Sequence, residues 1–484
     1  MSVPSDDEST LSKLGYVQEL ARCLGGFSNF AISLSIICIL AGGLTSFHLG
    51  FAAAGPGGVC IGWAACGLFS LAVAATMGQL ASAYPTAGGL YHWASTLGGR
   101  GWGWATAWFN LAGLIAVLAA INVGMVLFAF GAFAPDDPPS PLTQAILVAL
   151  VTASQAAINH SGMRVTRILT DLSGYWIMLV AVVLTISLFL AAPAIDWSRL
   201  RTFQNLTGTP AGDAPVWPRV ESVAWAFALG LLLPAYTITG FDASAHTAEE
   251  TLSAALNVPK GIIRSVWVSG VFGWFMVVGI VMAIPDLNVA AEQGTNVFFH
   301  TLRGVMPPVW ANILLGGCVL AQYLCGLATV TSTSRMAFAF ARDGGLPTSH
   351  WVRRVSKKFQ TPAVAIWGIS TAAVLFTMYT PVYSTITAVC TIFLYVSYVL
   401  PTITGFIAHG NRWTVMGPWH LGRWYRPLAA ISVLGCAGLI FIGIQPPNDQ
   451  AVIVLGAFVL TLLAGWFGYA AKHFPGPPHL RENP

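Results

Sequence analysis

Long apolar segments recur along the whole chain, separated by shorter stretches that carry most of its charged residues. A helix needs about 20 mostly apolar residues to cross a lipid bilayer. Segments that meet this criterion lie at residues 25–48, 58–80, 102–134, 142–159, 173–195, 222–246, 262–284, 309–341, 362–380, 383–408, 427–445 and 450–471. The pattern therefore predicts an all-α integral membrane protein with twelve transmembrane helices.

The sixth apolar segment contains an interruption. Pro234 removes a backbone donor, and Gly240 lies among polar residues whose side chains compete with helical hydrogen bonding, namely Thr237, Thr239 and Asp242. Irregular backbone inside a membrane is tolerated only where its polar groups face protein, water or a ligand. The residues around this interruption are therefore candidates for half of a substrate site.

The first apolar segment shows a comparable weakness. Gly42 and Gly43 follow Ala41 near its middle, and a pair of glycines costs roughly 2 kcal/mol of helix propensity. Close packing of small residues against a neighbouring helix is the alternative explanation. The two interruptions lie five helices apart, and interrupted segments at matching positions in two halves are typical of inverted-repeat transporters. We therefore predict repeats made of spans one to five and six to ten, with the last two spans outside them.

These spans divide the chain into four parts. Residues 1–24 form a polar N-terminal segment, 25–408 the ten-helix inverted-repeat core, 409–472 a loop with two additional helices, and 473–484 a Pro-rich tail that we expect to be disordered. Eighteen of the 22 Lys and Arg residues fall on the side of the membrane that holds both termini. The positive-inside rule therefore places both termini in the cytoplasm, in a multi-pass protein of the cell membrane.

The composition agrees with this class. Of the 484 residues, 56% are hydrophobic and 8% are charged, whereas about a quarter of the residues in a soluble domain are charged. The net charge of +4 is small and indicates no nucleic-acid partner. All eight cysteines except Cys23 lie in apolar spans without metal-ligand spacing, so we expect no disulfide, no metal centre and no cofactor.

Asp242 is the one acidic residue that lies within an apolar span. A charge at the bilayer centre costs roughly 2.5–3.5 kcal/mol on insertion scales, so such a residue is a functional candidate by default. The alternative is a structural acid that accepts hydrogen bonds from neighbouring amide groups. The spans contain no paired carboxylates or His-rich cluster, no ring of charges for a pore and no P-loop motif. A secondary transporter is therefore favoured over an intramembrane enzyme, a channel or an ATP-driven pump.

Four loop motifs resemble those of the amino acid–polyamine–organocation (APC) permeases. Residues 84–93 (YPTAGGLYHW) resemble the family's loop after the second span, and residues 341–347 (ARDGGLP) its signature at the end of the eighth. Residues 247–260, which contain TAEET and NVPK, resemble its acidic loop after the sixth span. Residues 417–424 (GPWHLGRW) resemble the branch that holds GABA, choline and general amino acid permeases.

The resemblance implies a LeuT-like fold with twelve helices, in which a 5+5 inverted repeat has unwound first and sixth helices. It also implies that a substrate carboxylate binds backbone amides of the first helix and that an ammonium group binds carbonyls of the sixth. The dipoles of the half-helices favour both placements. The residues matched to this site are Cys38, Ile39, Ala41, Gly42, Gly43, Tyr236, Thr237, Ile238, Thr239 and Gly240, with Asn122 and Thr329 lining the side-chain pocket.

Individual roles also follow from the resemblance. Tyr236 is matched to an aromatic lid over the substrate and Asp242 to an acid tied to proton-linked gating. A packed aromatic and an interhelical hydrogen bond remain the alternatives for Tyr236 and Asn122. Residues 171–195 of the fifth span contain no Lys or Arg, which argues against a lysine-type proton mechanism. A sodium site would use hydroxyls of the eighth span, namely Thr329, Thr331, Ser332 and Thr333.

The sequence therefore predicts a permease that moves a small amine-bearing solute, in the simplest case an amino acid, by alternating access. GABA, choline, ethanolamine and polyamines are alternative substrates, and coupling to H⁺, coupling to Na⁺ and uncoupled exchange all stay open. The basic cluster at residues 353–358 is interpreted as a topological anchor, with binding of anionic membrane lipid as the alternative.

Overall fold

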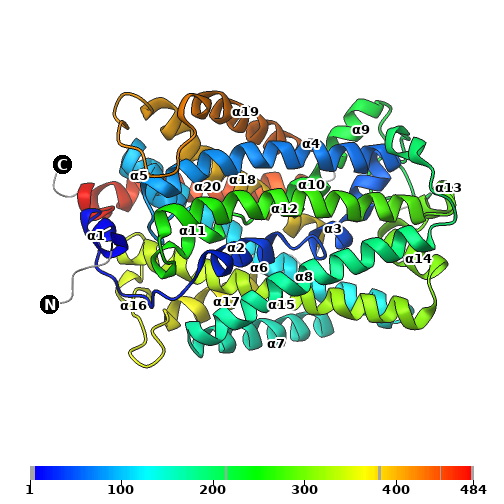
Figure 1. The fold of residues 1–484 in the computed structure, drawn as a ribbon, viewed down its shortest axis with the longest axis horizontal. Coiled ribbons are helices and arrows are strands. Elements are labelled where there is room, and N and C mark those ends of the chain that lie inside the picture. Colours follow the sequence, from blue (N-terminus) through cyan, green and yellow to red (C-terminus); the bar gives the residue numbers. More distant parts are fainter. Residues whose placement is uncertain (1–5, 213–214, 380–382, 447, 481–484) are drawn as a thin grey trace.

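The structure is a computed structural model that describes residues 6–212, 215–379, 383–446 and 448–480. Across these residues the regular elements are helices, and the β-pairing consists of isolated bridges only. Figure 1 shows the long helices running side by side along one axis. We call the end that carries both termini, α1 (Asp6–Lys13), α5 (Leu90–Gly98) and α16 (Ser349–Val352) the terminal end. The opposite end carries α9 (Val223–Gly230), α13 (Leu287–Ala291) and α14 (Val297–Val305).

Ten segments of the described chain are helical, long and apolar enough to cross a membrane. They are Gly26–Thr45, α4 (Phe47–Ala83), α6 (Arg100–Phe133), α7 (Pro141–His160), α8 (Met163–Ala191), α12 (Ala254–Ala283), α15 (Pro308–Arg342), most of α18 (Tyr383–Ala408), Gly422–Gly443 with α19 (Tyr425–Gly443), and Gln450–His473 with α20 (Asp449–Gly465) and α21 (Ala471–His473). The sixth and ninth predicted spans form shorter apolar helices, Val223–Thr237 and α17 (Ala363–Tyr379). The chain is therefore an all-helical, multi-pass membrane protein.

The first predicted span is broken near its middle. α2 (Gly26–Ile37) ends at Cys38, whose φ of 26° is incompatible with a right-handed helix, and α3 (Gly42–Thr45) begins after it. The helix resumes in α3 and is followed directly by α4. α4 itself bends at Gly55, where φ is 68°. The break therefore precedes the glycine pair, and the two glycines open the second half-helix instead of forming the gap.

The sixth predicted span is broken as well, but not at its proline. Pro234 lies in the first turn of α10 (Leu232–Thr237), where a helix needs no backbone donor. The helix ends at Ile238, and Gly240 takes a φ of 81° before the short helix α11 (Ala243–His246) begins. The glycine, not the proline, therefore produces the interruption.

The two broken helices lie in the middle of the molecule. α2 packs against α8, α12 and α15, while α10 packs against α3, α4 and α18. In the most apolar window of Gly26–Thr45, 89% of the residues are buried, against 28% for Gly422–Gly443 and 11% for Gln450–His473. The last two helices are therefore peripheral, and the polar interruptions are surrounded by protein, as irregular backbone in a membrane requires.

The C-terminal segment is packed against the terminal end up to residue 480. Phe474 is buried between Tyr91 and Phe340, and its carbonyl accepts a hydrogen bond of 3.1 Å from Arg100. Pro478 covers Gly15 of the N-terminal segment. The expectation of a disordered tail therefore does not describe residues 474–480, and residues 481–484 lie outside the described chain.

Candidate functional site

The two helix breaks lie against each other. A Cβ atom added to Gly42 would come within 2.8 Å of Thr237 Oγ1 and 2.9 Å of Thr237 Cα, so the start of α3 touches the end of α10. A Cβ atom on Gly240 would collide with the side chain of Ile36 in α2. Glycine is required at both contacts, and the structure brings the predicted residues of the first and sixth spans together.

The first break presents backbone donors. The carbonyl of Cys38 accepts the amides of Ala41 at 2.8 Å and Gly42 at 3.2 Å. The amides of Ile39 and Leu40, both buried, have no hydrogen-bond partner within the described residues. A buried amide without a partner costs free energy, so these two groups favour an anionic ligand. Ile39 was among the residues predicted for this site and Leu40 was not, and both precede Ala41, Gly42 and Gly43.

The sixth break presents acceptors. Gly240 donates its amide to the hydroxyl of Tyr398 at 2.9 Å, and Thr239 Oγ1 donates to the carbonyl of Tyr236 at 2.7 Å. The carbonyls of Ile238 and Thr239 accept no hydrogen bond from the described part of the chain. Donors of one break and acceptors of the other are the groups that a zwitterion needs at its carboxylate and its ammonium.

A cavity leads from the opposite end toward these breaks. It has a volume of about 540 Å³ and is lined by residues that include Thr45, His48, Phe128, Phe299 and Tyr383. Tyr383 OH lies 2.8 Å from Thr45 Oγ1, and its ring lies perpendicular to that of the buried Tyr236 at a centroid distance of 6.4 Å. The two tyrosines therefore stand between the cavity and the breaks.

Asp242 is fully buried just after the sixth-helix break. Its Oδ1 accepts from Tyr398 OH at 2.8 Å, and its Oδ2 accepts from Asn110 Nδ2 at 2.9 Å. His246 Nε2 lies 3.2 Å from the same Oδ2. Because Tyr398 also accepts the amide of Gly240, the acid is connected to the break through one hydroxyl.

These contacts determine how many protons Asp242 and His246 share. His246 Nδ1 lies 3.1 Å from the carbonyl of Ala87, which can only accept, so Nδ1 must carry a proton. The contact between Nε2 and Asp242 then needs a second proton, which resides either on the imidazole or on the carboxyl group. The pair therefore holds one proton more than a neutral histidine beside a carboxylate. Loss of that proton would remove one of the two hydrogen bonds of the His246 ring, which is part of α11.

The predicted sodium ligands on α15 mostly donate within their own helix. Thr329 Oγ1 donates to the carbonyl of Cys325 at 2.9 Å, and Thr333 Oγ1 donates to that of Thr329 at 2.7 Å. Thr331 points elsewhere, because its hydroxyl donates to Asn159 Oδ1 at 2.7 Å. The hydroxyl of Ser332 is buried and has no partner in the described chain. Their oxygen lone pairs remain available as ligands, but the four hydroxyls do not form one cluster.

Asn122 makes the interhelical hydrogen bonds that were the alternative to substrate contact. Its Nδ2 donates to Thr152 Oγ1 at 2.8 Å and to Gln155 Oε1 at 2.9 Å. Gln155 Nε2 returns a bond of 3.0 Å to Asn122 Oδ1, and both side chains press against Gly326 of α15. The asparagine therefore joins α6, α7 and α15 with its amide hydrogens fully used.

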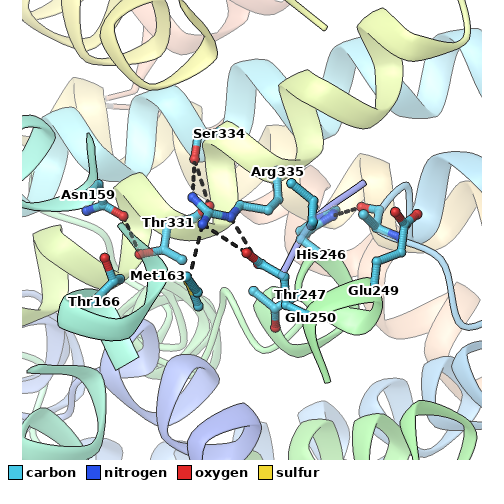
Figure 2. Close-up of polar contacts among 12 residues, drawn as sticks. Asn159, Met163, Thr166, His246, Thr247, Glu249, Glu250, Thr331, Ser334 and Arg335 are labelled. Atoms are coloured by element: carbon cyan, nitrogen blue, oxygen red, sulfur yellow. Dashed lines mark hydrogen bonds and ion pairs between the residues drawn. The ribbon is translucent and has the colours of Figure 1, made fainter. Parts of the chain in front are cut away.

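The terminal end is closed by buried ion pairs. Arg335 of α15 is fully buried and donates to both oxygens of Glu250, at 3.0 Å from Nε and 3.1 Å from Nη2. The third guanidinium nitrogen, Nη1, donates to Ser334 Oγ at 3.0 Å, and Nη2 also contacts Met163 Sδ at 3.2 Å (Figure 2). A bidentate pair in which every guanidinium nitrogen has a partner is the arrangement in which a buried salt bridge is best compensated.

A second pair lies beside the first. Arg342 donates to both oxygens of Glu249, at 2.9 and 2.8 Å, and the amide of Ala87 donates to Glu249 Oε1 at 3.0 Å. Burial raises the pKa of the Glu249 carboxyl, but the Arg342 guanidinium, the Ala87 amide and Arg22 together lower that pKa below its ordinary value. Tyr16 of the N-terminal segment covers Arg342, whose Cζ lies 4.1 Å from the ring centroid. The N-terminal segment is therefore part of the closure.

The halves of the two broken helices at the terminal end are tied together. Ser33 Oγ donates to the carbonyl of Phe241 at 2.8 Å and accepts the amide of Ser244 at 2.9 Å. Asn29 Nδ2 donates to the carbonyl of Ser244 at 2.9 Å. Because these bonds join α2 to the segment around α11, the two half-helices form one packed unit next to the ion pairs.

Sequence reasoning missed several residues of this region. Tyr383 and Tyr398 lie in the tenth predicted span, and no local pattern marks them as neighbours of the breaks. Arg335 lies in the eighth predicted span and Glu250 in the acidic loop after the sixth, and neither was predicted to form an ion pair. Both residues lie near the ends of apolar segments, and this position was the only feature that could have marked them. The sequence does not show that they pair, because they lie 85 residues apart.

The fold and the site together define the class of protein. A helical multi-pass membrane protein with two polar helix interruptions in contact at its centre has the arrangement of a transporter. A sequence model of the family described as amino acid permease matches residues 24–468, so the chain belongs to the amino acid permease family.

Individual relatives agree with this assignment. The chain is 31% identical over 507 residues to the amino-acid permease BAT1 of Arabidopsis thaliana, covering 96% of this chain and 95% of the relative. It is 32% identical over 502 residues to the BAT1 homolog of Oryza sativa subsp. japonica, covering 96% and 94%. The GABA-specific permease of Saccharomyces cerevisiae is 25% identical over 508 residues, with coverage of 98% and 86%. The APC resemblance of the loop motifs is thereby confirmed.

Proposed function

We propose that this protein is a secondary active transporter of a small amine-bearing solute, in the first instance an amino acid. The observation that carries the proposal is the contact between the two helix breaks at Gly42 and Thr237. It places the unpaired amides of Ile39 and Leu40 and the unpaired carbonyls of Ile238 and Thr239 in the interior of a membrane protein. The amino acid substrates implied by the names of the relatives support the same solute class.

The proposed architecture is the twelve-helix, LeuT-like arrangement with a five-plus-five inverted repeat. In support, the breaks fall in the first and sixth predicted spans, and the last two helices are peripheral. Transport would proceed by alternating access, with the opposite end open to the outside and the terminal end closed toward the cytoplasm. We place the protein in the cell membrane with both termini cytoplasmic, because the Lys and Arg residues gather at that end.

The proposed coupling ion is H⁺. In support, the Asp242–His246 pair needs a proton to satisfy Ala87 and Asp242 at once, and Tyr398 links that pair to the amide of Gly240. Proton loss would therefore loosen α11 next to the substrate carbonyls. Coupling to Na⁺ has weaker support, because the four hydroxyls of α15 point in different directions.

The test is uptake of a panel of solutes into proteoliposomes, with a pH gradient or a sodium gradient imposed separately. The panel contains neutral and cationic amino acids, GABA, choline, ethanolamine and a polyamine. We expect uptake of an amino acid driven by an inward proton gradient. Uptake of choline or a polyamine alone would show that the substrate is not an amino acid. Uptake driven only by a sodium gradient would overturn the assignment of H⁺ as the coupling ion. Exchange that needs neither gradient would show an uncoupled carrier.

Two variants examine the proton pair in the same assay. Asp242→Asn and His246→Gln should each reduce proton-driven uptake by at least about tenfold, a barrier change of about 1.4 kcal/mol, while the protein stays inserted. The matched control is Asp136→Asn, which alters an exposed acid at the opposite end. Asp242→Asn with full activity at every pH would remove the role given to this acid.

A further inference from the structure

A cavity separate from the substrate site opens at the terminal end of the molecule. It has a volume of about 570 Å³ and lies where the chain enters α2, where α8 begins and where the loop before α17 passes. Its charged lining residues are Arg164, Arg167 and Lys358, and no acidic residue lines it. We call it the Arg164 cavity.

The positive charges of this cavity are not neutralised by the described protein. Arg164 and Lys358 are exposed and make no ion pair with any described residue. Arg167 donates from Nη1 to the carbonyl of Cys23 at 3.1 Å and makes no ion pair with any described residue. Glu250 is already paired with Arg335. Three uncompensated cations around one cavity repel one another and favour a bound anion.

The start of α8 adds to this field. Its N-cap residue is Gly162, with a φ of 118°, and no side chain caps the first turn. The amides at a helix N-terminus carry partial positive charge and bind phosphate well. Met163 and Arg164, the first two residues of α8, both line the cavity, so the uncapped turn faces the same space as the cations.

An exposed apolar stripe runs from this cavity along α8. Ile168, Leu172 and Tyr175 follow Arg164 at intervals of four, four and three residues, which places them on one face of the helix. Their side chains are 58%, 48% and 63% exposed, respectively. Phe27 of α2 stacks on Tyr175 at a centroid distance of 4.6 Å and widens the stripe. The cationic cavity therefore lies at the head of a surface suited to acyl chains.

We propose that the Arg164 cavity binds the phosphate of an anionic phospholipid, whose acyl chains lie along the Ile168–Tyr175 stripe. A free phosphate ion shares the headgroup chemistry, but it would make no use of the apolar stripe that continues from Arg164. The lipid would bridge α8 to the loop that carries Lys358, next to the bond between Arg167 and the start of α2. Lipid binding at this cavity requires only that the protein lies in a membrane. Its test is therefore independent of which solute the protein transports.

The experiment uses the full-length protein in nanodiscs and in detergent. Native mass spectrometry would count bound phosphatidylglycerol against phosphatidylcholine, and thermal unfolding would be followed with each lipid and with inorganic phosphate. We expect phosphatidylglycerol to bind and raise the unfolding midpoint, and phosphatidylcholine and inorganic phosphate to have little effect. Equal stabilisation by inorganic phosphate, or equal binding of both lipids, would overturn the proposal.

Matched variants locate the site. The double variant Arg164→Gln and Lys358→Gln should bind phosphatidylglycerol about tenfold more weakly than the parent protein. The control is the double variant Arg353→Gln and Lys357→Gln, which removes the same charge from residues that line another cavity of this end. This control should bind phosphatidylglycerol like the parent. Arg164→Lys keeps the charge and should retain most of the binding, which separates loss of the site from loss of folding. Equal weakening by both double variants would show a diffuse surface attraction and contradict a site at Arg164.

Discussion

The two ends of this transporter differ in how they are held together. At the terminal end, Arg335 and Arg342 form bidentate ion pairs with Glu250 and Glu249, and segments from both termini pack over them. At the opposite end, no ion pair is formed among the described residues, and a cavity of about 540 Å³ reaches in as far as Tyr383. One end is sealed by buried charges, and the other is lined by aromatic and small side chains.

This difference indicates how each end could change state. A buried ion pair is compensated only while its geometry is intact, so the terminal end should open as a unit or not at all. At the opposite end, the hydroxyl of Tyr383 lies 2.8 Å from Thr45 Oγ1 and 3.5 Å from Ser46 Oγ, and its ring packs on Tyr236. Hydrogen bonds between neutral groups contribute little each, so these contacts can rearrange at low cost. The Asp242 network lies between the two ends and contacts the break through Tyr398.

The largest effect is expected from breaking the buried ion pair at the terminal end. Arg335→Met leaves Glu250 buried without a partner, which typically costs about 3–5 kcal/mol. We expect a lower thermal midpoint and greater reactivity of cysteines introduced beside α2 toward reagents applied at the terminal end. Arg201→Met, at an exposed arginine of the opposite end, is the control. The double variant with Glu250→Gln should recover part of the loss, and an unchanged midpoint in Arg335→Met would show that the pair does not hold this end closed.

Bulk at the contact between the breaks should have the next largest effect. Gly42→Val places methyl groups where Cβ alone would already lie 2.8 Å from Thr237 Oγ1, and overpacking of this kind costs about 1–3 kcal/mol. We expect loss of amino acid binding and uptake. Gly456→Val on α20 is the matched control, because a Cβ there meets nothing within 4 Å. Unchanged affinity in Gly42→Val would argue against a substrate site at the first break.

A smaller effect is expected at the opposite end. Tyr383→Phe removes the 2.8 Å contact with Thr45 Oγ1 but keeps the ring, and a single hydrogen bond contributes about 0.5–1.5 kcal/mol. Solute uptake should change severalfold in rate with little change in thermal midpoint. The exposed Tyr379, mutated to Phe, is the control. A large fall in midpoint for Tyr383→Phe would show that this end is held as firmly as the other.

The smallest effect concerns pH at the terminal end. Burial, with His479 and Arg342 nearby, lowers the pKa of His92 well below its ordinary value of 6.5, and Tyr16, Tyr84 and His479 face its ring. A histidine whose pKa is lowered by folding supports the folded state above its ordinary pKa, and that support is lost as pH falls below it. The thermal midpoint should therefore fall as the pH is lowered from about 7 to about 5, and it should fall less in His92→Phe. An identical pH dependence in both proteins would exclude His92 as the source.

Much of the fold could be predicted from the sequence, because the length of an apolar segment and the position of its glycines determine the local helical structure. The spans, the interruption near Gly240 and the weakness around Gly42 all follow from rules that apply within a few residues. The same local rules predicted that Pro234 helps to interrupt the helix, but Pro234 lies in the first turn of α10, where proline is tolerated. They also placed the first break at the glycines instead of at Cys38.

The network around the breaks could not be predicted, because it is built from residues far apart in the chain. Tyr398 lies 156 residues from Asp242, and Arg335 lies 85 residues from Glu250. Nothing in the sequence around Asp242 indicates that His246 must share a proton with it, since that follows from the position of the Ala87 carbonyl. The packed C-terminal segment was missed because its prolines suggested disorder, while Phe474 and Pro478 provide the contacts that hold it.

The proposed transport requires that a solute is held where the first and sixth helices are both interrupted. The most direct measurement is an electron cryo-microscopy map of the purified protein with a transported amino acid bound. We predict density for the solute between residues 38–43 and 236–240, with its carboxylate near the amides of Ile39 and Leu40. Continuous helices through these residues, or a solute bound elsewhere with the breaks empty, would contradict the account.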